Sequence, residues 1–203
     1  MRQMVCVVLL ALLMAGCLSS SAPDVKAWSI GAVPPDPSRT RQLEGTGQLY
    51  GSSRLGSVVV NAPYDRTQFT VHRADGTDAA DHYNVFSAAP SSLLRAAAQS
   101  GLGADGRLGH VVHQSSVLTT DAQVEIQVKE LSLDCREPGR RAACAAVSLD
   151  VIKVGRGPRT LASTGEGRAA VDAQDGDYGR AFSQAFSNAL DAALLDALGP
   201  RRK

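Results

Sequence analysis

The first hydrophobic feature of the chain is an unbroken apolar run of ten residues, from Met4 to Leu13. It follows a short segment with one positive charge, Arg2, and it is too short to span a bilayer as a helix. A charged start followed by such a run is typical of a secretory signal peptide. We therefore expect the protein to leave the cytoplasm.

Alternation of apolar and polar residues beyond this run predicts a series of strands. They cover residues 28–30, 55–60, 68–73, 83–86, 110–117, 123–133 and 145–154, followed by a weaker pair at 160–164 and 167–171. In segment 123–133 the alternation changes phase between Val128 and Leu131, which predicts a β-bulge. Segment 38–54 is rich in Gly, Ser and Arg and has little periodicity, so we expect a loop or insertion there.

Two segments predict helices. Residues 91–100 contain Ala and Leu between a capping Ser and Gly101, which are start and stop signals. From Tyr178 onward, with Asp177 placed to cap, large apolar residues recur every four positions: Phe182, Phe186, Leu190, Leu194 and Leu198. This spacing predicts a helix of about 20 residues that packs one face on the sheet. A lipid-binding or partner-binding helix is the alternative.

Composition and charge exclude several classes of protein. The 203 residues are 44% hydrophobic and 20% charged, which is ordinary for a globular protein. The net charge of +1 provides no basic field for nucleic acid. The length favours one domain, or one domain with an arm.

The end of the apolar run carries a second signal, Leu13-Met14-Ala15-Gly16-Cys17. It resembles the bacterial lipobox, in which a peptidase cleaves before a cysteine that carries diacylglycerol. The resemblance implies that residues 1–16 are a lipoprotein signal peptide and that Cys17 is the lipidation site. An ordinary signal peptidase that cuts nearby is the alternative.

Cleavage before Cys17 has consequences for the mature chain. It removes Arg2 from the 21 basic residues and leaves 20 basic against 20 acidic residues, so attachment to a membrane would depend on acyl chains. Two acyl chains already anchor a protein stably, and a triacylated Cys17 would have three. In enterobacterial-type sorting, an Asp directly after the lipidated cysteine retains a lipoprotein in the inner membrane. This chain has Leu18 at that position, and the absence of Asp resembles the signal for the outer membrane. We expect residues 17–27 to be the lipidated cysteine and a flexible tether, and residues 28–200 the folded domain.

Two unlipidated cysteines remain after cleavage, Cys135 and Cys144. They flank the basic loop 136–143 between two predicted strands. In an oxidising compartment we expect them to form a disulfide across the neck of this hairpin, stabilising the fold by about 2–3 kcal/mol. A metal-binding pair is the alternative, but no His lies at a useful spacing.

No pattern in the sequence predicts an enzyme. Gly101, Gly103 and Gly106 match G-x-G-x-x-G, but they follow a predicted helix and precede a strand, the reverse of the order in nucleotide-binding folds. His110 and His113 would point to opposite faces of a strand, and His72 and His82 flank an Asp-rich turn typical of a solvated loop. We therefore expect no catalytic residue, no metal and no cofactor.

Taken in order, these elements resemble the ABC-type transport auxiliary lipoproteins, the PqiC-like family, over roughly residues 28–198. The resemblance rests on the following marks: Trp28-Ser29-Ile30 soon after the lipid cysteine, an aliphatic strand leading to Pro63-Tyr64, a strand ending in His72-Arg73, the segment 83–90, a short helix, a middle hairpin and the long C-terminal helix. The long 38–54 segment and the Cys135/Cys144 pair are departures from the family pattern.

The resemblance implies an α+β fold: a single small domain with a mostly antiparallel or mixed sheet, on which one short and one long C-terminal helix pack. It implies a non-catalytic lipoprotein of the outer membrane that serves an MCE-type ABC system for (phospho)lipid transport between membranes. The implied partners are a periplasmic MCE-domain protein, a permease and an ATPase on separate chains. Association with further copies of the same chain, as a homo-oligomer, is an additional candidate. The candidate interface residues are Pro63, Tyr64, Tyr83 and Phe86. Two rival functions are regulation of a cell-wall synthase and direct carriage of lipid.

Overall fold

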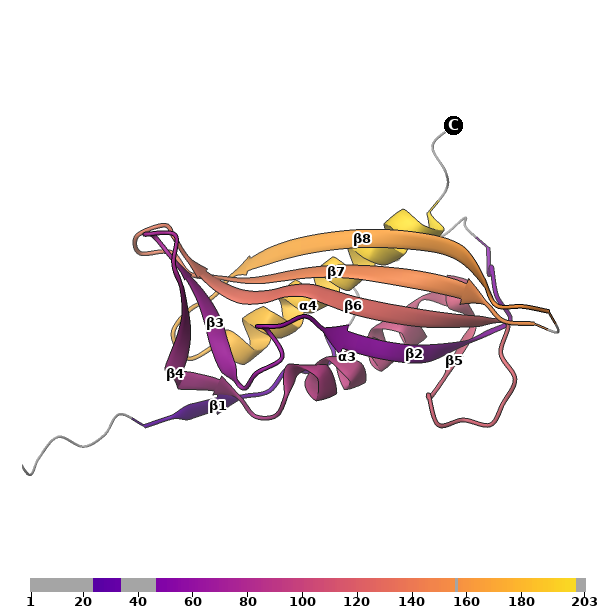
Figure 1. Cartoon of the computed structure of the whole chain (residues 1–203), viewed down its shortest axis with the longest axis horizontal. Coiled ribbons are helices and arrows are strands. Elements are labelled where there is room, and N and C mark those ends of the chain that lie inside the picture. The colour runs from indigo at the N-terminus through magenta and orange to yellow at the C-terminus, as the bar shows by residue number, and fades with distance from the viewer. Residues whose placement is uncertain (1–23, 34–46, 156, 200–203) are drawn as a thin grey trace, which may run out of the picture.

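The computed structural model describes residues 24–33, 47–155 and 157–199, so the predicted leader and Cys17 lie outside the described residues. Eight strands form one sheet: β1 (Lys26–Trp28), β2 (Ser52–Val60), β3 (Gln68–Arg73), β4 (Asp78–Phe86), β5 (His110–Val112), β6 (Ala122–Cys135), β7 (Ala142–Lys153) and β8 (Thr160–Asp172). Two α-helices, α3 (Pro90–Ala104) and α4 (Tyr178–Leu198), and a short 3₁₀ helix, η1 (Gly106–Leu108), complete the domain (Figure 1). No helix in the described ranges is long and apolar enough to cross a membrane.

Strand β6 organises the sheet because it is long enough to pair with three neighbours. Its first half lies parallel to β2 and its last residues lie parallel to β3, while β7 runs antiparallel along its other edge. Strand β5 extends the sheet beyond β2, strands β4 and β1 extend it beyond β3, and β8 follows β7. The predicted α+β domain with a mixed sheet is confirmed.

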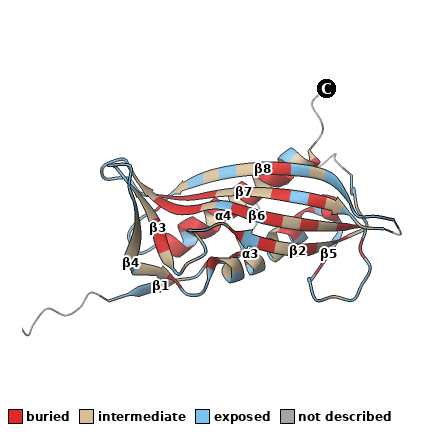
Figure 2. Ribbon diagram, in the orientation of Figure 1, coloured by how far each residue is buried: buried red, intermediate tan, exposed pale blue. Residues whose placement is uncertain are grey.

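Helices α3 and α4 cover one face of this sheet, and the core lies between them and the strands (Figures 1 and 2). The predicted apolar face of α4 is buried, from Phe182 to Leu198. At one end of the core the Phe69 ring lies 4.5 Å from that of Phe86 and 4.9 Å from that of Phe182, centroid to centroid. Ring contacts at such distances stabilise a core beyond the area that they bury.

The structure lengthens or shortens several predicted elements. Helix α3 begins at Pro90, a residue suited to the first helical position, and its N-cap, Ala89, offers no capping side chain. It also continues through Gly101 to Ala104, because Leu102 still packs into the core. Asp177 occupies the N-cap of α4, but its side chain makes no capping hydrogen bond.

The strand limits also differ in places. Strand β5 ends at Val112, β4 begins at Asp78, β2 begins inside the segment expected to be a loop, and β1 begins at Lys26, within the expected tether. The predicted bulge in β6 is confirmed, since its register with β7 shifts between Val128 and Glu130.

The two weak strands predicted at the end of the sheet are one continuous strand, β8. Glycine is unfavourable in strands, so Gly165 and Gly167 gave the appearance of a break. Helix α4 crosses β8 so closely that a Cβ atom on Gly165 would lie 2.1 Å from the carbonyl oxygen of Ala193. The two glycines therefore leave room for the backbone of the helix, and they do not interrupt the strand.

Candidate functional site

The predicted disulfide between Cys135 and Cys144 is absent, and both residues are free thiols. Cys144 lies opposite Ser132 in the β6–β7 ladder, three residues from Cys135. Three residues of strand span about 10 Å and place the two side chains on opposite faces. A disulfide needs Cα atoms within about 7 Å, so this register prevents the bond. Burial raises the pKa of both thiols, which keeps them protonated and unreactive.

The basic loop between β6 and β7 is neutralised by its surroundings. Arg136 binds Asp134 through two nitrogens, and this contact lowers the pKa of Asp134 to about 2. Arg140 contacts Glu137 and Asp172, and Arg141 contacts Asp175 and the Tyr178 hydroxyl. Because each arginine already has an acidic partner, the loop presents no free cluster of cations.

The four predicted interface residues do not form one surface. Phe86 is only 2% exposed and belongs to the aromatic core, so its assignment to an interface was wrong. Its position at the inward-facing end of β4 explains the difference, since alternate residues of a strand face opposite sides. Tyr83 is 54% exposed and is available for contact. Pro63 and Tyr64 lie in the β2–β3 loop, where Tyr64 is half-buried against the core.

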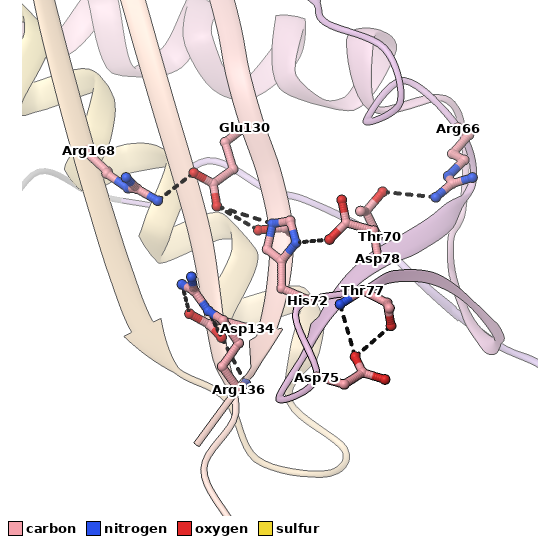
Figure 3. A network of polar contacts seen from close by, with 11 residues as sticks. Arg66, Thr70, His72, Asp75, Thr77, Asp78, Glu130, Asp134, Arg136 and Arg168 are labelled. Atoms are coloured by element: carbon pink, nitrogen blue, oxygen red, sulfur yellow. Dashed lines mark hydrogen bonds and ion pairs between the residues drawn. The ribbon is translucent and has the colours of Figure 1, made fainter. Parts of the chain in front are cut away.

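Close to Tyr64, strands β3, β4, β6 and β8 meet in a polar network centred on His72 (Figure 3). His72 Nδ1 lies 2.5 Å from Asp78 Oδ1, and His72 Nε2 lies 3.6 Å from Glu130 Oε1. The imidazole therefore lies between two carboxylates, one on β4 and one on β6.

Glu130 connects this histidine to the rest of the sheet. Its Oε1 accepts a hydrogen bond from the buried Ser132 hydroxyl at 2.9 Å, and its Oε2 accepts one from Arg168 Nη2 at 2.7 Å. Burial, followed by the charges of Glu130 and Asp78, raises the pKa of the Tyr64 hydroxyl. The network thus joins four strands and lies beside one of the predicted interface residues.

The chemistry of the network favours a structural role. The Ser132 hydroxyl donates to Glu130 but is fully buried, so it lacks the exposure that a nucleophile needs to reach a substrate. Among the described residues, no group of three His, Cys, Asp or Glu side chains could hold a metal ion. His110 and His113 are separated as well, because β5 ends between them.

Part of the network was accessible from the sequence. His72 and Asp78 lie directly opposite each other in the β3–β4 hairpin, and a tight turn at residues 74–77 would have predicted that pair. The position of Glu130 was not accessible, since it depends on the bulge in β6 and on the parallel pairing of β3 with β6.

Comparison with known proteins shows similarity at the level of structure. No family model and no curated protein matches the sequence. Protein XCC0632 from Xanthomonas campestris, assigned to the DUF330 family, superposes with a TM-score of 0.60 at 15% identity, over 86% of this chain and 91% of its own. The chain shares the fold of that protein.

Two further solved structures are similar. An uncharacterised protein superposes with a TM-score of 0.54 at 12% identity, over 80% of this chain and 93% of its own. A dodecamer of PelC from Paraburkholderia phytofirmans matches with a TM-score of 0.42 at 13% identity, over 88% and 95%. The first of these two supports the same fold.

Proposed function

We propose that the protein is a non-catalytic lipoprotein of the outer membrane that serves as an auxiliary subunit of an MCE-type ABC system for intermembrane (phospho)lipid transport. The observation that carries this proposal is a combination: a lipobox-like segment ending in Cys17, followed by a single domain with the fold of a DUF330 protein. The fold shared with that protein agrees with the small α+β domain that the sequence resemblance implies.

The start of the folded domain is compatible with membrane attachment. Strand β1 begins at Lys26, nine residues after Cys17. Nine extended residues reach about 30 Å, so an anchor at Cys17 would keep the β1 end of the sheet close to the membrane. The partner protein would then meet the domain at a short distance from the bilayer surface.

The pairing of the polar groups agrees with a non-catalytic protein. His72, Glu130 and Arg168 are engaged with one another or with neighbouring side chains, and the arginines of the β6–β7 loop are paired with carboxylates. A site that transforms a substrate needs groups poised for the reacting atoms. These groups are instead used within the sheet.

The experiment is affinity capture after chemical crosslinking in intact Gram-negative cells that express the tagged full chain. The proposal predicts capture of an MCE-domain protein by the wild type and loss of that capture in a Cys17→Ala variant, whose folded domain is unchanged. Capture of a cell-wall synthase instead would favour the rival regulator. Absence of an MCE protein from the crosslinked material would contradict the proposal.

A further inference from the structure

Four of the seven large hydrophobic side chains that are exposed in the described part of the chain belong to segments at the two ends of one long edge of the molecule, the lower edge in Figure 1. At one end, Val25 directly precedes β1, and Tyr83 lies on the neighbouring part of β4. At the other end, Val117 and Leu118 lie in the loop between β5 and β6. Scattered exposed apolar residues are normal, whereas several along one edge indicate an interaction surface.

The loop between β5 and β6, residues 113–121, projects from this edge (Figures 1 and 2). At its apex, Val117 is 98% and Leu118 is 56% exposed. Residues 114–120 contain no ionisable side chain, so the apex can leave water without desolvating a charge of its own. We call Val117 and Leu118 the apolar apex.

Two arginines contact this loop beside the apolar apex. Arg54 donates a hydrogen bond to the carbonyl oxygen of Leu118, and Arg95 donates one to the side-chain oxygen of Gln114. Neither arginine has a carboxylate partner among the described residues. The carboxylate at the base of the loop, Asp121, instead accepts a hydrogen bond from a backbone N–H of β2 at 3.0 Å. Two positive charges that the protein does not neutralise therefore lie beside the apex.

We propose that this edge lies on an anionic phospholipid surface, with the apolar apex inserted among the lipid headgroups. Apolar side chains flanked by arginines suit such a surface, because the apex leaves water while the guanidinium groups bind lipid phosphates. Tyr83, near the other end of the edge, has the amphipathic ring that is common at membrane interfaces. A bilayer offers apolar surface and negative charge along the whole edge, so it accommodates both ends at once.

The inference rests on the proposed anchor at Cys17 and adds an orientation to it. Strand β1 begins nine residues after Cys17, and the tether of about 30 Å brings the β1 end of the edge to the bilayer. The apolar apex lies at the opposite end of the same edge, so it supplies a second point of contact that the tether alone does not provide. With both ends in contact, the domain lies along the membrane, and β8 at the upper edge in Figure 1 faces away from it.

Fluorescence quenching by brominated lipids tests the contact directly. The purified full chain, whose only Trp is Trp28, is reconstituted in vesicles of brominated phosphatidylcholine and phosphatidylglycerol, and the signal of the parent chain is subtracted. Leu118→Trp should lose emission in these vesicles relative to vesicles of unbrominated lipid. The control is Leu161→Trp, which replaces a leucine of similar exposure on β8 and should keep its emission. Equal quenching of the two variants, or no quenching of Leu118→Trp, would overturn the inference.

Lipid charge and vesicle flotation supply two further readouts. Omitting phosphatidylglycerol should weaken the quenching of Leu118→Trp, and adding Arg54→Gln and Arg95→Gln, which keep an amide donor beside the loop, should remove this dependence on lipid charge. Quenching of Leu118→Trp that is equal with and without phosphatidylglycerol would overturn an anionic surface as the partner. Flotation with the vesicles reports on the anchor: a chain that floats without quenching refutes this inference alone, whereas a chain that does not float refutes the anchor at Cys17 and with it both proposals.

Discussion

A Cβ atom on Gly167 would lie 2.0 Å from the backbone carbonyl oxygen of Ala189. The strand and the helix that contribute these residues, β8 and α4, are therefore in backbone contact. With Gly165 two residues earlier, Gly167 forms a pair of positions without side chains over which the alanines of α4 pass. Replacing either glycine must push the long helix away from the sheet.

We predict that Gly167→Ala lowers the free energy of unfolding by about 2–3 kcal/mol, because the new methyl group overlaps a backbone atom that cannot rotate away. Urea unfolding followed by circular dichroism measures the change. Gly157→Ala is the matched control, since its Cβ would have no neighbour within 4 Å. An equal loss of stability in the two variants would contradict the close packing of α4 on β8.

The second prediction compares the stability effects of a buried and an exposed aromatic residue of β4. Phe86→Ala should destabilise the protein by about 3–5 kcal/mol, because it leaves a cavity beside Phe69 and Phe182. Tyr83→Ala should change stability by less than about 0.5 kcal/mol, because its side chain is exposed. Thermal unfolding of both variants checks this. A mild effect of Phe86→Ala would mean that its ring is not in the core.

The third prediction concerns Glu130, which binds His72, Ser132 and Arg168. Glu130→Ala should cost about 1–3 kcal/mol, because the buried Ser132 hydroxyl then lacks its acceptor. Lys129→Ala, which removes a neighbouring exposed ion pair with Glu166, should cost less than about 1 kcal/mol. Chemical denaturation of the two variants distinguishes them, and an equal cost would refute the central position of Glu130.

The fourth prediction is a dependence on alkaline pH. Burial, together with a hydrogen bond to Asp175, raises the pKa of Tyr178 to about 12. The unfolded chain releases this proton near pH 10, so the contribution to stability is complete below pH 10 and is lost as the pH rises from 10 to 12. Tyr178→Phe should be about 1–2 kcal/mol less stable at pH 7, because Asp175 and Arg141 lose a partner. It should also lose less stability than the wild type between pH 10 and 12. Parallel slopes for the two proteins would contradict the assignment.

The pattern of apolar residues predicted the structure correctly where the structure depends on one element alone. The limits of β3, the bulge after Val128 and the long helix from Tyr178 agree with the sequence-based predictions. Each of these follows from the period of apolar residues within one element. The break predicted within β8 failed because the reason for Gly165 and Gly167 lies in another element, helix α4.

The hairpin that carries the two cysteines shows the same limit. Ala142 and Ala143 have little strand propensity, so the sequence assigned them to the loop. In the structure β7 begins at Ala142, which lies opposite Asp134, and Cys144 is therefore inside the ladder. Register depends on the pairing of two strands. Because the predicted loop was too long, the predicted register placed the two cysteines opposite each other, which the observed register does not.

Anchoring of this domain to a membrane through Cys17 can be tested by mass spectrometry of the mature N-terminus. The full chain is expressed in Gram-negative cells, and its N-terminal peptide is recovered from the outer-membrane fraction. We predict a peptide that begins at Cys17 and carries a diacylglyceryl group and an N-linked acyl chain. A mature chain that begins elsewhere, or an unmodified Cys17, would contradict it.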